Sequence, residues 1–424
     1  MAQNTLHTSL TSWISVETDS DFSIQNLPFG IYGDKSIQHR ACSAIGDYII
    51  DLSVLNEQGY FSALNISNDV FNQSTLNDFI SLGKHTTSAL RNRLSDLLSS
   101  TNSELQTSTA IFDLVFKKQS DVCMLLPVKI GDYTDFFSSI DHATNTGTMF
   151  RDPANALLPN WKHIPVGYHG RASSICVSGH SFHRPKGQMK PIDATVPVFG
   201  PTKQLDIELE TAFIIGKSTK MGEAISTSNA DDYIFGMVLF NDWSARDIQA
   251  WEYVPLGPFL GKNFASTTSA WIVTLDALEP FRTNGYIQEP TVLPYLAYSG
   301  DKNIDINLEV HLITENGDDN LVSTSNYKYM YWTMEQQLAH HTVNGCNINV
   351  GDMMASGTIS GPKKEEYGSF LELTWKGTQP MTLKDGTERK FVNDNDTIIL
   401  KGYCKKDGVR VGFGECKATL LPAL

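Results

Sequence analysis

The chain has 424 residues, of which 41% are hydrophobic and 19% charged, and its formal net charge is -14. This composition is ordinary for a globular protein, and the length is sufficient for two or three domains with a large buried core. The negative charge argues against nucleic acid and anionic membranes as partners, because both attract clustered positive charge.

Two features bear on the expected location of the protein. Residues 1–10 contain neither a basic segment nor a long apolar segment, so no signal peptide is expected, and no apolar run reaches the roughly 18 residues of a spanning helix. The six cysteines are scattered singly without a C-x-x-C pair, which disfavours a zinc knuckle or a disulfide framework. We therefore expect a cytoplasmic protein.

Short strands and two helices are expected in the first 120 residues. Apolar runs at 29–32 and 41–55, the second broken by Gly46 and Asp47, predict strands joined by tight turns. Residues 74–83 predict a helix that ends at a glycine, and the leucine spacing over 90–98 predicts an amphipathic helix to about Ser99. The Ser/Thr-rich residues 99–109 predict a linker, with a domain boundary near 110–122.

From Val122 the pattern becomes that of a large, mainly β domain. Residues 122–128 predict a short buried strand, and the alternation of apolar residues over 304–312, followed by Asn316-Gly317, predicts a half-exposed strand and a hairpin. Thr333 and Gln336 form a capping box that opens a short helix, which Asn344-Gly345 closes. Further strands are predicted at 371–375, 397–400 and 409–413.

Glu208 and Glu210 are the first candidates for chemistry. Alternate side chains of a strand share a face, so the two glutamates lie about 7 Å apart with like charges. If that face is buried, they must be protonated, paired or bound to a cation, and a hard divalent ion with oxygen ligands satisfies this need. An ordinary acidic edge strand explains the pair equally well.

Two aspartates could extend this acidic set. Asp242 follows the apolar strand 233–240, and a carboxylate just past a strand end is well placed to face a pocket. For Asp135 the spacing favours a solvated loop acid. Because the spacing does not match an EF-hand loop, the pattern does not identify the ion.

Other candidates are a histidine and a polar helix. His142 lies seven residues after Asp135 in a segment without periodicity, so we predict a loop location, although a lone histidine is more often structural. Arg246 and Gln249 share a face of a predicted helix, with Tyr253 one turn further along. A cation, an amide and a phenol on one side suit a small carboxylate or diketone; incidental polar residues on a surface helix remain the alternative.

Motifs of other enzyme classes do not occur. The sequence contains no H-E-x-x-H, G-x-S-x-G, P-loop or G-x-G-x-x-G pattern. Zinc protease, serine hydrolase, nucleotide hydrolase and dinucleotide enzyme therefore have no sequence support.

Long ordered stretches of the chain resemble the fumarylacetoacetase family. The clearest is DYTDFFSSIDHATNTG at 132–147, and the others lie at 155–175, 204–210, 236–262, 331–347 and 355–362. The N-terminal part matches more loosely, through residues 26–33. The resemblance implies a mainly β fold, with an N-terminal SH3-like barrel domain at 1–120 and a C-terminal mixed β-sandwich roll at 121–424, assembled as a homodimer.

The resemblance also implies an activity and a site. The activity is hydrolysis of a carbon-carbon bond in the β-diketo acid 4-fumarylacetoacetate, which gives fumarate and acetoacetate. The implied Ca²⁺ ligands are Asp135, Glu208, Glu210 and Asp242, and Lys262 and Ser266 fall where the family binds a structural Mg²⁺. His142 corresponds to the general base, oriented by Glu372; the groups that stabilise negative charge are Arg246, Gln249 and Lys262; and the substrate contacts are Arg151, Tyr168, Gln249, Tyr253 and Thr358.

Two residues depart from the family pattern. Phe137 stands where the family has a tyrosine that contacts substrate, and Ser266 stands where it has a threonine. The serine keeps a hydroxyl ligand, whereas Phe137 leaves open an altered substrate preference. Two alternatives therefore remain: a hydrolase of another β-diketo acid or acylpyruvate, and a catalytically silent binding protein with the same fold.

Overall fold

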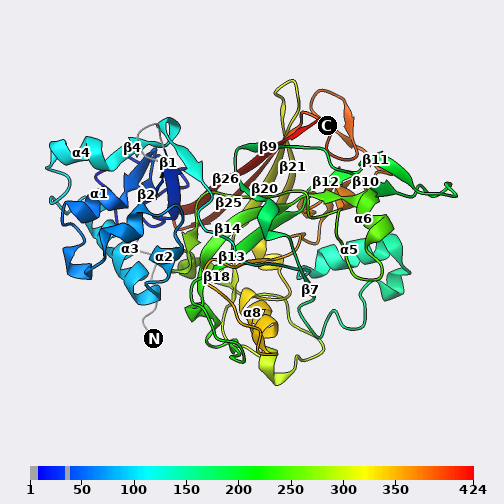
Figure 1. Cartoon of the computed structure of the whole chain (residues 1–424), viewed down its shortest axis with the longest axis horizontal. Helices are drawn as coiled ribbons and strands as arrows, with labels where there is room; N and C mark the ends of the chain where they lie inside the picture. The colour runs from blue at the N-terminus through cyan, green and yellow to red at the C-terminus, as the bar shows by residue number, and fades with distance from the viewer. Residues whose placement is uncertain (1–7, 34–38) are drawn as a thin grey trace.

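The computed structural model describes residues 8–33 and 39–424, and it confirms a mainly β fold with an N-terminal and a C-terminal part (Figure 1). Residues 1–7, on which part of the signal-peptide expectation rests, lie outside the described residues. Within the described ranges, no helix combines the length and the apolar character that crossing a membrane requires.

The N-terminal part is built on a five-stranded antiparallel sheet in the order β4-β3-β2-β1-β5. Its strands are β1 (Phe29–Gly33), β2 (Arg40–Ile45), β3 (Tyr48–Asp51), β4 (Phe116–Lys118) and β5 (Cys123–Leu125). Its helices are α1 (Leu52–Glu57), α2 (Asn77–Ile80), α3 (Lys84–Leu98) and α4 (Thr109–Val115). Because β5 pairs with β1, this sheet continues a few residues past 120, and β5 is half-exposed instead of buried.

Local hydrogen bonds explain where this part differs from expectation. The strand expected to continue to residue 55 ends at Asp51, because the Asp51 side chain accepts the Val54 N–H and caps α1. The helix expected over 74–83 shortens to α2, while Gly83, with φ of 86°, precedes α3. The amphipathic helix α3 is confirmed, and its predicted leucines are all buried.

The C-terminal part packs two sheets face to face. The central sheet runs β7-β6-β22-β13-β14-β16-β8, with β17 also on β14. Its strands are β6 (Tyr133–Phe136), β7 (Gly167–His169), β8 (Ile175–Val177), β13 (Leu209–Ile215), β14 (Ile234–Asp242), β16 (Ser266–Thr268), β17 (Val273–Thr274) and β22 (Met353–Ala355). The second sheet, in the order β21-β20-β25-β26-β9, contains β9 (His180–His183), β20 (Asn307–Ile313), β21 (Asp319–Asn326), β25 (Thr397–Lys406) and β26 (Val409–Leu421).

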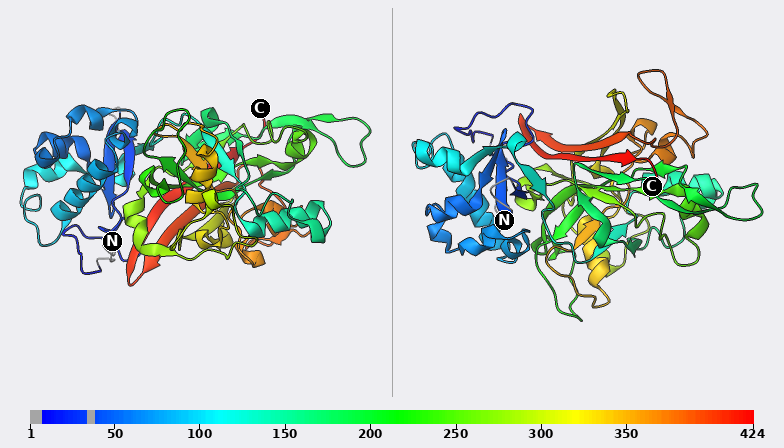
Figure 2. Two further views of the ribbon diagram at one scale, coloured as in Figure 1. Left: turned by 90° about the horizontal axis from the view of Figure 1, so that it is seen from below. Right: turned by 45° about the horizontal axis from the view of Figure 1, so that its top comes forward.

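Five helices and four short strand pairs complete the C-terminal part. The helices are α5 (Ile140–Phe150), α6 (Arg246–Glu252), α7 (Leu275–Leu278), α8 (Met334–Thr342) and α9 (Phe370–Leu373). The strand pairs are β10 (Lys186–Met189) with β11 (Val198–Pro201), β12 (Leu205–Asp206) with β15 (Ser244–Ala245), β18 (Arg282–Thr283) with β19 (Asn303–Ile304), and β23 (Met381–Thr382) with β24 (Glu388–Arg389). The β10–β11 hairpin projects away from the body (Figures 1 and 2).

The two faces of the central sheet serve different cores. On β13, Leu209, Phe213 and Ile215 pack into the core shared with the second sheet. Ala212 and Ile214 face the opposite side, where they share a core with the N-terminal part. Alternation along β13 therefore places Glu210 on the face that the N-terminal part covers further along.

Most C-terminal strand and helix predictions are confirmed. The predicted hairpin is β20–β21, β20 alternates between buried and half-buried residues, and Thr333 and Gln336 form the capping box of α8. The strand predicted at 371–375 is wrong, because this segment contains helix α9. Ser369 caps α9, and the Asp206 carboxylate accepts the N–H groups of Phe370 and Leu371.

Candidate metal centre and active site

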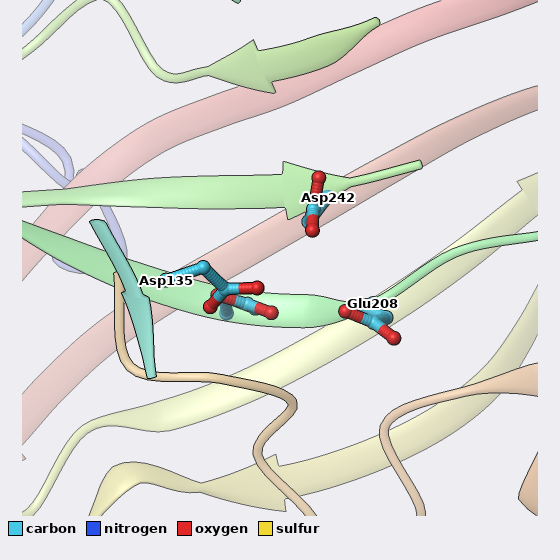
Figure 3. A group of neighbouring side chains, drawn as sticks. Asp135, Glu208 and Asp242 are labelled. Atoms are coloured by element: carbon cyan, nitrogen blue, oxygen red, sulfur yellow. The ribbon is translucent and has the colours of Figure 1, made fainter. Parts of the chain in front are cut away.

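Four buried carboxylates meet at one end of the central sheet. Asp135 lies on β6, Glu210 on β13 and Asp242 at the last position of β14, while Glu208 lies between β12 and β13. Each offers an oxygen that lies within 4.8 Å of the others. Figure 3 shows Asp135, Glu208 and Asp242 projecting from separate segments toward a common space.

Burial decides between the alternatives that the sequence left open for these acids. The acidic edge strand is excluded for Glu208 and Glu210, since both side chains are buried. The expectation of a solvated loop for Asp135 is wrong: β6 pairs in parallel with β22, opposite Ala355, and this pairing carries Asp135 into the interior. Residues 135 and 355 are far apart in sequence, so local spacing could not reveal the contact.

Two cations lie among the carboxylates. Lys262 Nζ donates to Glu208 Oε2 at 2.6 Å and to Asp242 Oδ2 at 2.7 Å. Arg246 Nη1 donates to Glu208 Oε1 at 2.7 Å, and its Nε donates to Asp206 Oδ2 at 2.8 Å. Glu208 is therefore held between both cations.

The pKa values follow from this uneven distribution of positive charge. Burial is the largest influence on Glu208 and would raise its pKa, but Lys262 and Arg246 hold that pKa below its usual range. Burial raises the pKa of Asp135 and of Glu210 well above their usual ranges, and the charges of neighbouring carboxylates raise them further. Burial also raises the pKa of Asp242, although Lys262 opposes this effect. Asp135 and Glu210 are thus the acids with the greatest need of another cation.

The residues present fit a divalent ion with oxygen ligands. Within residues 8–33 and 39–424, Asp135 Oδ1 and Glu210 Oε1 are buried without a hydrogen-bond partner. With Asp206 included, five buried carboxylates pair with two cations among the described residues, Arg246 and Lys262, which leaves an excess of negative charge. A hard cation would supply both the missing charge and the missing partners.

Two hydroxyl groups and one backbone N–H donate further hydrogen bonds to the cluster. Ser266 Oγ donates to Asp242 Oδ1 at 3.1 Å, and Tyr168 Oη donates to Asp242 Oδ2 at 3.1 Å. Gly357 N–H donates to Glu210 Oε2 at 3.1 Å. Gly357 has φ of 77°, and a Cβ there would lie 2.1 Å from the Phe136 carbonyl oxygen, so only glycine fits this close approach.

His142 lies on α5, not on the loop expected from its sequence. Ser139 Oγ accepts the His142 N–H and caps the helix, and the absence of apolar periodicity in this polar segment concealed it. His142 Nδ1 lies 2.7 Å from Glu372 Oε2, and both residues are buried. His142 is also close enough to Glu208 to act on its pKa, so the structure brings the histidine beside the carboxylate cluster.

Of the residues expected to contact substrate, some contact other residues of the site and others are exposed. Gln249 lies on α6 with Oε1 at 3.5 Å from Arg246 Nη1, and Phe137 meets the His142 ring edge-on at 5.3 Å between centroids. Tyr253 is exposed just beyond α6, and Arg151 is exposed at the end of α5, where it donates to the Ala156 carbonyl.

Two donors in this region keep unused hydrogen-bonding capacity. In the part of the chain that the structure describes, Arg246 Nη2 and Thr358 Oγ1 are buried and unpartnered. A buried donor without a partner is costly, so both groups are suited to receive oxygen atoms of a ligand.

Asp206 is a functional residue that the sequence analysis did not select. It holds Arg246 through one oxygen and the N-terminus of α9, which carries Glu372, through both. The signal was its place in the acidic run at 206–210, but strand alternation directed attention to the glutamates. Ser360 and Ser369, which donate to Glu372 Oε2, carried no sequence signal.

Family models match both parts of the chain. Residues 133–421 match the model described as fumarylacetoacetate (FAA) hydrolase C-terminal, and residues 25–127 match fumarylacetoacetase N-terminal. The chain is 53% identical over 415 residues to the fumarylacetoacetase of Homo sapiens, covering 97% of this chain and 99% of that protein. It is 52% identical over 420 residues to that of Dictyostelium discoideum, covering 98% of both.

A solved structure supports the fold independently. The fumarylacetoacetate hydrolase from Exiguobacterium antarcticum aligns with a TM-score of 0.53 and 18% identity, covering 93% of this chain and 99% of that one. At this identity the likeness concerns the fold alone.

The carboxylate cluster predicts that divalent metal stabilises the fold. Adding Ca²⁺ or Mg²⁺ to chelator-treated protein should raise the midpoint of thermal unfolding, because an ion that binds only the folded state shifts the equilibrium toward it. Asp135→Asn should reduce this rise, whereas Asp132→Asn, at an exposed acid next to β6, should preserve it. An equal rise in the Asp135 variant would contradict the assignment; differential scanning calorimetry provides the measurement.

Proposed function

The chain belongs to the fumarylacetoacetase family and hydrolyses fumarylacetoacetate to fumarate and acetoacetate, and we propose that His142 activates the attacking water beside a bound divalent ion. This reaction is the last step of tyrosine and phenylalanine catabolism. The observation that carries the mechanism is the buried His142–Glu372 pair next to the carboxylate cluster.

The hydrogen bond between His142 and Glu372 supports the role of base. An ionised carboxylate only accepts hydrogen bonds, so Nδ1 must carry the hydrogen, and Nε2 is then free to take a proton from water. Burial would raise the pKa of Glu372, but His142 and the surrounding donors hold it below its usual range. The persistent negative charge stabilises the imidazolium that forms when water loses its proton.

A divalent ion would be held by Asp135, Glu208, Glu210 and Asp242. When bound, it supplies Lewis-acid polarisation of a substrate oxygen. We propose Ca²⁺ for these four residues. A structural Mg²⁺ near Lys262 and Ser266 is a further proposal, which rests on the family resemblance; because Lys262 Nζ is engaged with two carboxylates, any ligand atom of Lys262 would have to be its carbonyl oxygen.

The cations and the amide beside the cluster suit the charge that develops during cleavage. Attack of water on a substrate carbonyl places negative charge on its oxygen, and breaking the carbon-carbon bond leaves an electron pair that passes into the acetoacetate part as an enolate. We assign Arg246, Gln249 and Lys262 to stabilise these charges. Preorganised donors of this kind are typically worth about 10²–10³-fold in rate.

Substrate binding is assigned to residues around this centre. Tyr168 presents its hydroxyl at the cluster, and Thr358 directly follows Gly357, whose N–H donates to Glu210. Arg246 Nη2 and Thr358 Oγ1 add unpaired groups among the described residues. Arg151 and Tyr253 are more exposed and would reach a substrate from the rim, while Phe137 packs on the base. Together these groups suit an elongated substrate with carboxylates and carbonyls.

If His142 is the base, its removal should lower activity without affecting metal binding. His142→Ala should lower kcat by about 10²–10⁴-fold, the usual contribution of a general base, while metal still raises the unfolding midpoint. The decrease in fumarylacetoacetate absorbance and the calorimetric shift measure the two properties. Loss of the metal effect together with activity would contradict the assignment.

Because Phe137 lacks the phenol hydroxyl that the family's tyrosine carries, restoring it tests the substrate preference. Phe137→Tyr should leave activity toward fumarylacetoacetate similar or higher, because the base and the carboxylates are unchanged. Measuring kcat/KM for fumarylacetoacetate and for an acylpyruvate, in the wild type and in the variant, tests the assigned substrate. A strong wild-type preference for the acylpyruvate would favour the alternative activity.

We also propose a homodimer, supported by exposed apolar side chains on the projecting hairpin and the loop after α6. We define this apolar arm surface by Ile192, Val198, Phe199, Leu256 and Phe259, which are all exposed; Leu256 is 97% exposed. Trp251 Nε1 donates to Gln188 Oε1 and so joins α6 to the hairpin. Exposed apolar groups gathered on one feature are typical of an interface.

Substitution within the apolar arm surface should weaken the dimer. Leu256→Glu with Phe259→Glu should shift the mass measured by light scattering toward the monomer, because an interface that buries two added charges is destabilised. Met221→Glu, at an exposed apolar residue outside this surface, is the control. A monomeric wild type, or a fully dimeric double variant, would contradict the proposal.

A cytoplasmic location is proposed on the chemistry of the cysteines. All six are free thiols, and three of them are buried. Free thiols persist in a reducing compartment.

A further inference from the structure

The two oxygens of the Glu372 carboxylate accept hydrogen bonds from different donors. Its Oε2 accepts three: from His142 Nδ1 at 2.7 Å, from Ser369 Oγ at 2.8 Å and from Ser360 Oγ at 2.9 Å. Its Oε1 accepts from Asn145 Nδ2 at 2.9 Å. Helix α5 therefore contacts both oxygens, through His142 on Oε2 and through Asn145 on Oε1.

The two serines also serve the local backbone. Ser369 Oγ accepts the Glu372 N–H as the cap of α9, and Ser360 Oγ accepts the Gly368 N–H. Their hydroxyls fix the segment that carries Glu372. They do not connect this segment to the helix that carries the base.

Asn145 makes such a connection, in addition to the one that His142 itself makes. It lies three residues after His142 on α5, so both side chains leave the same face of one helix. Each holds a different oxygen of the same carboxylate, which fixes the plane of the carboxylate relative to the imidazole.

The chemistry of the carboxylate determines the orientation of this amide. An ionised carboxylate offers only acceptors, so the amide must present its NH₂ group to Glu372 Oε1. Without that donor, Oε1 would be a buried acceptor lacking a partner, and rotation of the carboxylate toward another donor would draw Oε2 out of line with Nδ1.

We propose that Asn145 is a positioning residue for the hydrolysis, holding the second oxygen of Glu372 so that the first stays aligned with His142 Nδ1. This inference rests on the proposed role of His142 as the base. It assigns to Asn145 no contact with substrate or metal.

Three substitutions separate a hydrogen-bond donor from a packing residue. Asn145→Ala should lower kcat by about 10–100-fold, as is typical when an outer partner of a catalytic group is lost, with KM within about two-fold. Asn145→Asp keeps the shape but places a second carboxylate against Glu372, so its kcat should fall further than that of the alanine variant. Asn145→Leu, which lacks both the donor and the charge, should resemble Asn145→Ala.

A packing role predicts a different order. The aspartate variant would then be nearly as active as wild type, and that result would overturn the proposal, as would wild-type kcat in the alanine variant. Thr144→Ala, on the exposed side of the same helix, is the matched control and should keep wild-type activity. If the aspartate variant does not fold, the alanine and leucine variants carry the test, and thermal unfolding with and without metal checks that they are folded.

A double-mutant cycle tests whether Asn145 acts through Glu372. In a Glu372→Gln background the effect of Asn145→Ala on kcat should shrink to within about three-fold, because residues that act as a unit are not additive. Additive effects would overturn the proposal. An active His142→Ala variant would instead contradict the role of the base, so the two failures are distinguishable.

Discussion

Burial of like charges is the constraint on which the active end of this molecule depends. Five carboxylates lie buried within a few residues of strand ends, and in the part of the chain that the structure describes, Lys262 and Arg246 are the cations that pair with them. Isolated buried charges are costly, so the cluster is stable only with charge compensation, by protons or by a cation. The raised pKa values of Asp135 and Glu210 identify where that compensation is incomplete. A site that must bind a cation in order to remain ionised is also a site that can polarise a substrate oxygen.

Asp206 connects the carboxylate cluster to the helix that carries Glu372. One of its oxygens pairs with Arg246 at the carboxylate cluster, and its carboxylate also accepts two N–H groups at the start of α9, which carries Glu372. Helix α9, which carries Glu372, and the Arg246 guanidinium are therefore both held by one side chain. Burial raises the pKa of the Asp206 carboxyl above its usual value, and Arg246 is the largest influence that opposes this rise. Loss of the contact with Arg246 would therefore be expected to disturb the position of α9, and loss of the contact with α9 would disturb Arg246.

Local pattern and distant pairing contributed differently to what the sequence could predict. Strand alternation predicted that Glu208 lies beside Glu210, and the two carboxylates do meet, although Glu208 lies in the short connection between β12 and β13. The end of an apolar strand correctly indicated that Asp242 joins this cluster. Asp135 needed the parallel pairing of β6 with β22, which brings together residues more than 200 positions apart and leaves no local periodicity. His142 was missed as a helical residue because α5 is polar and begins at a serine cap. Glu372 came only from the family resemblance, since its segment was expected to be a strand.

The N-terminal part packs against the sheet that carries this site, and none of its described residues belongs to the carboxylate cluster. Tyr133 and Phe240, each two residues before a cluster aspartate on its strand, belong to the same core as Phe29, Ile31 and Leu94. The face that carries the carboxylates is therefore continuous with the face that the N-terminal part buries. Tyr133 is itself fully buried and lies close enough to Asp135 and Asp242 for their charges to raise the pKa of its phenol, after burial as the largest cause. Removing water from this side of the sheet lowers the local dielectric, which strengthens every interaction of the cations with the carboxylates and raises the cost of leaving any of them unpaired. The covering N-terminal part thus raises the energetic cost of leaving the carboxylates of the cluster without charge compensation.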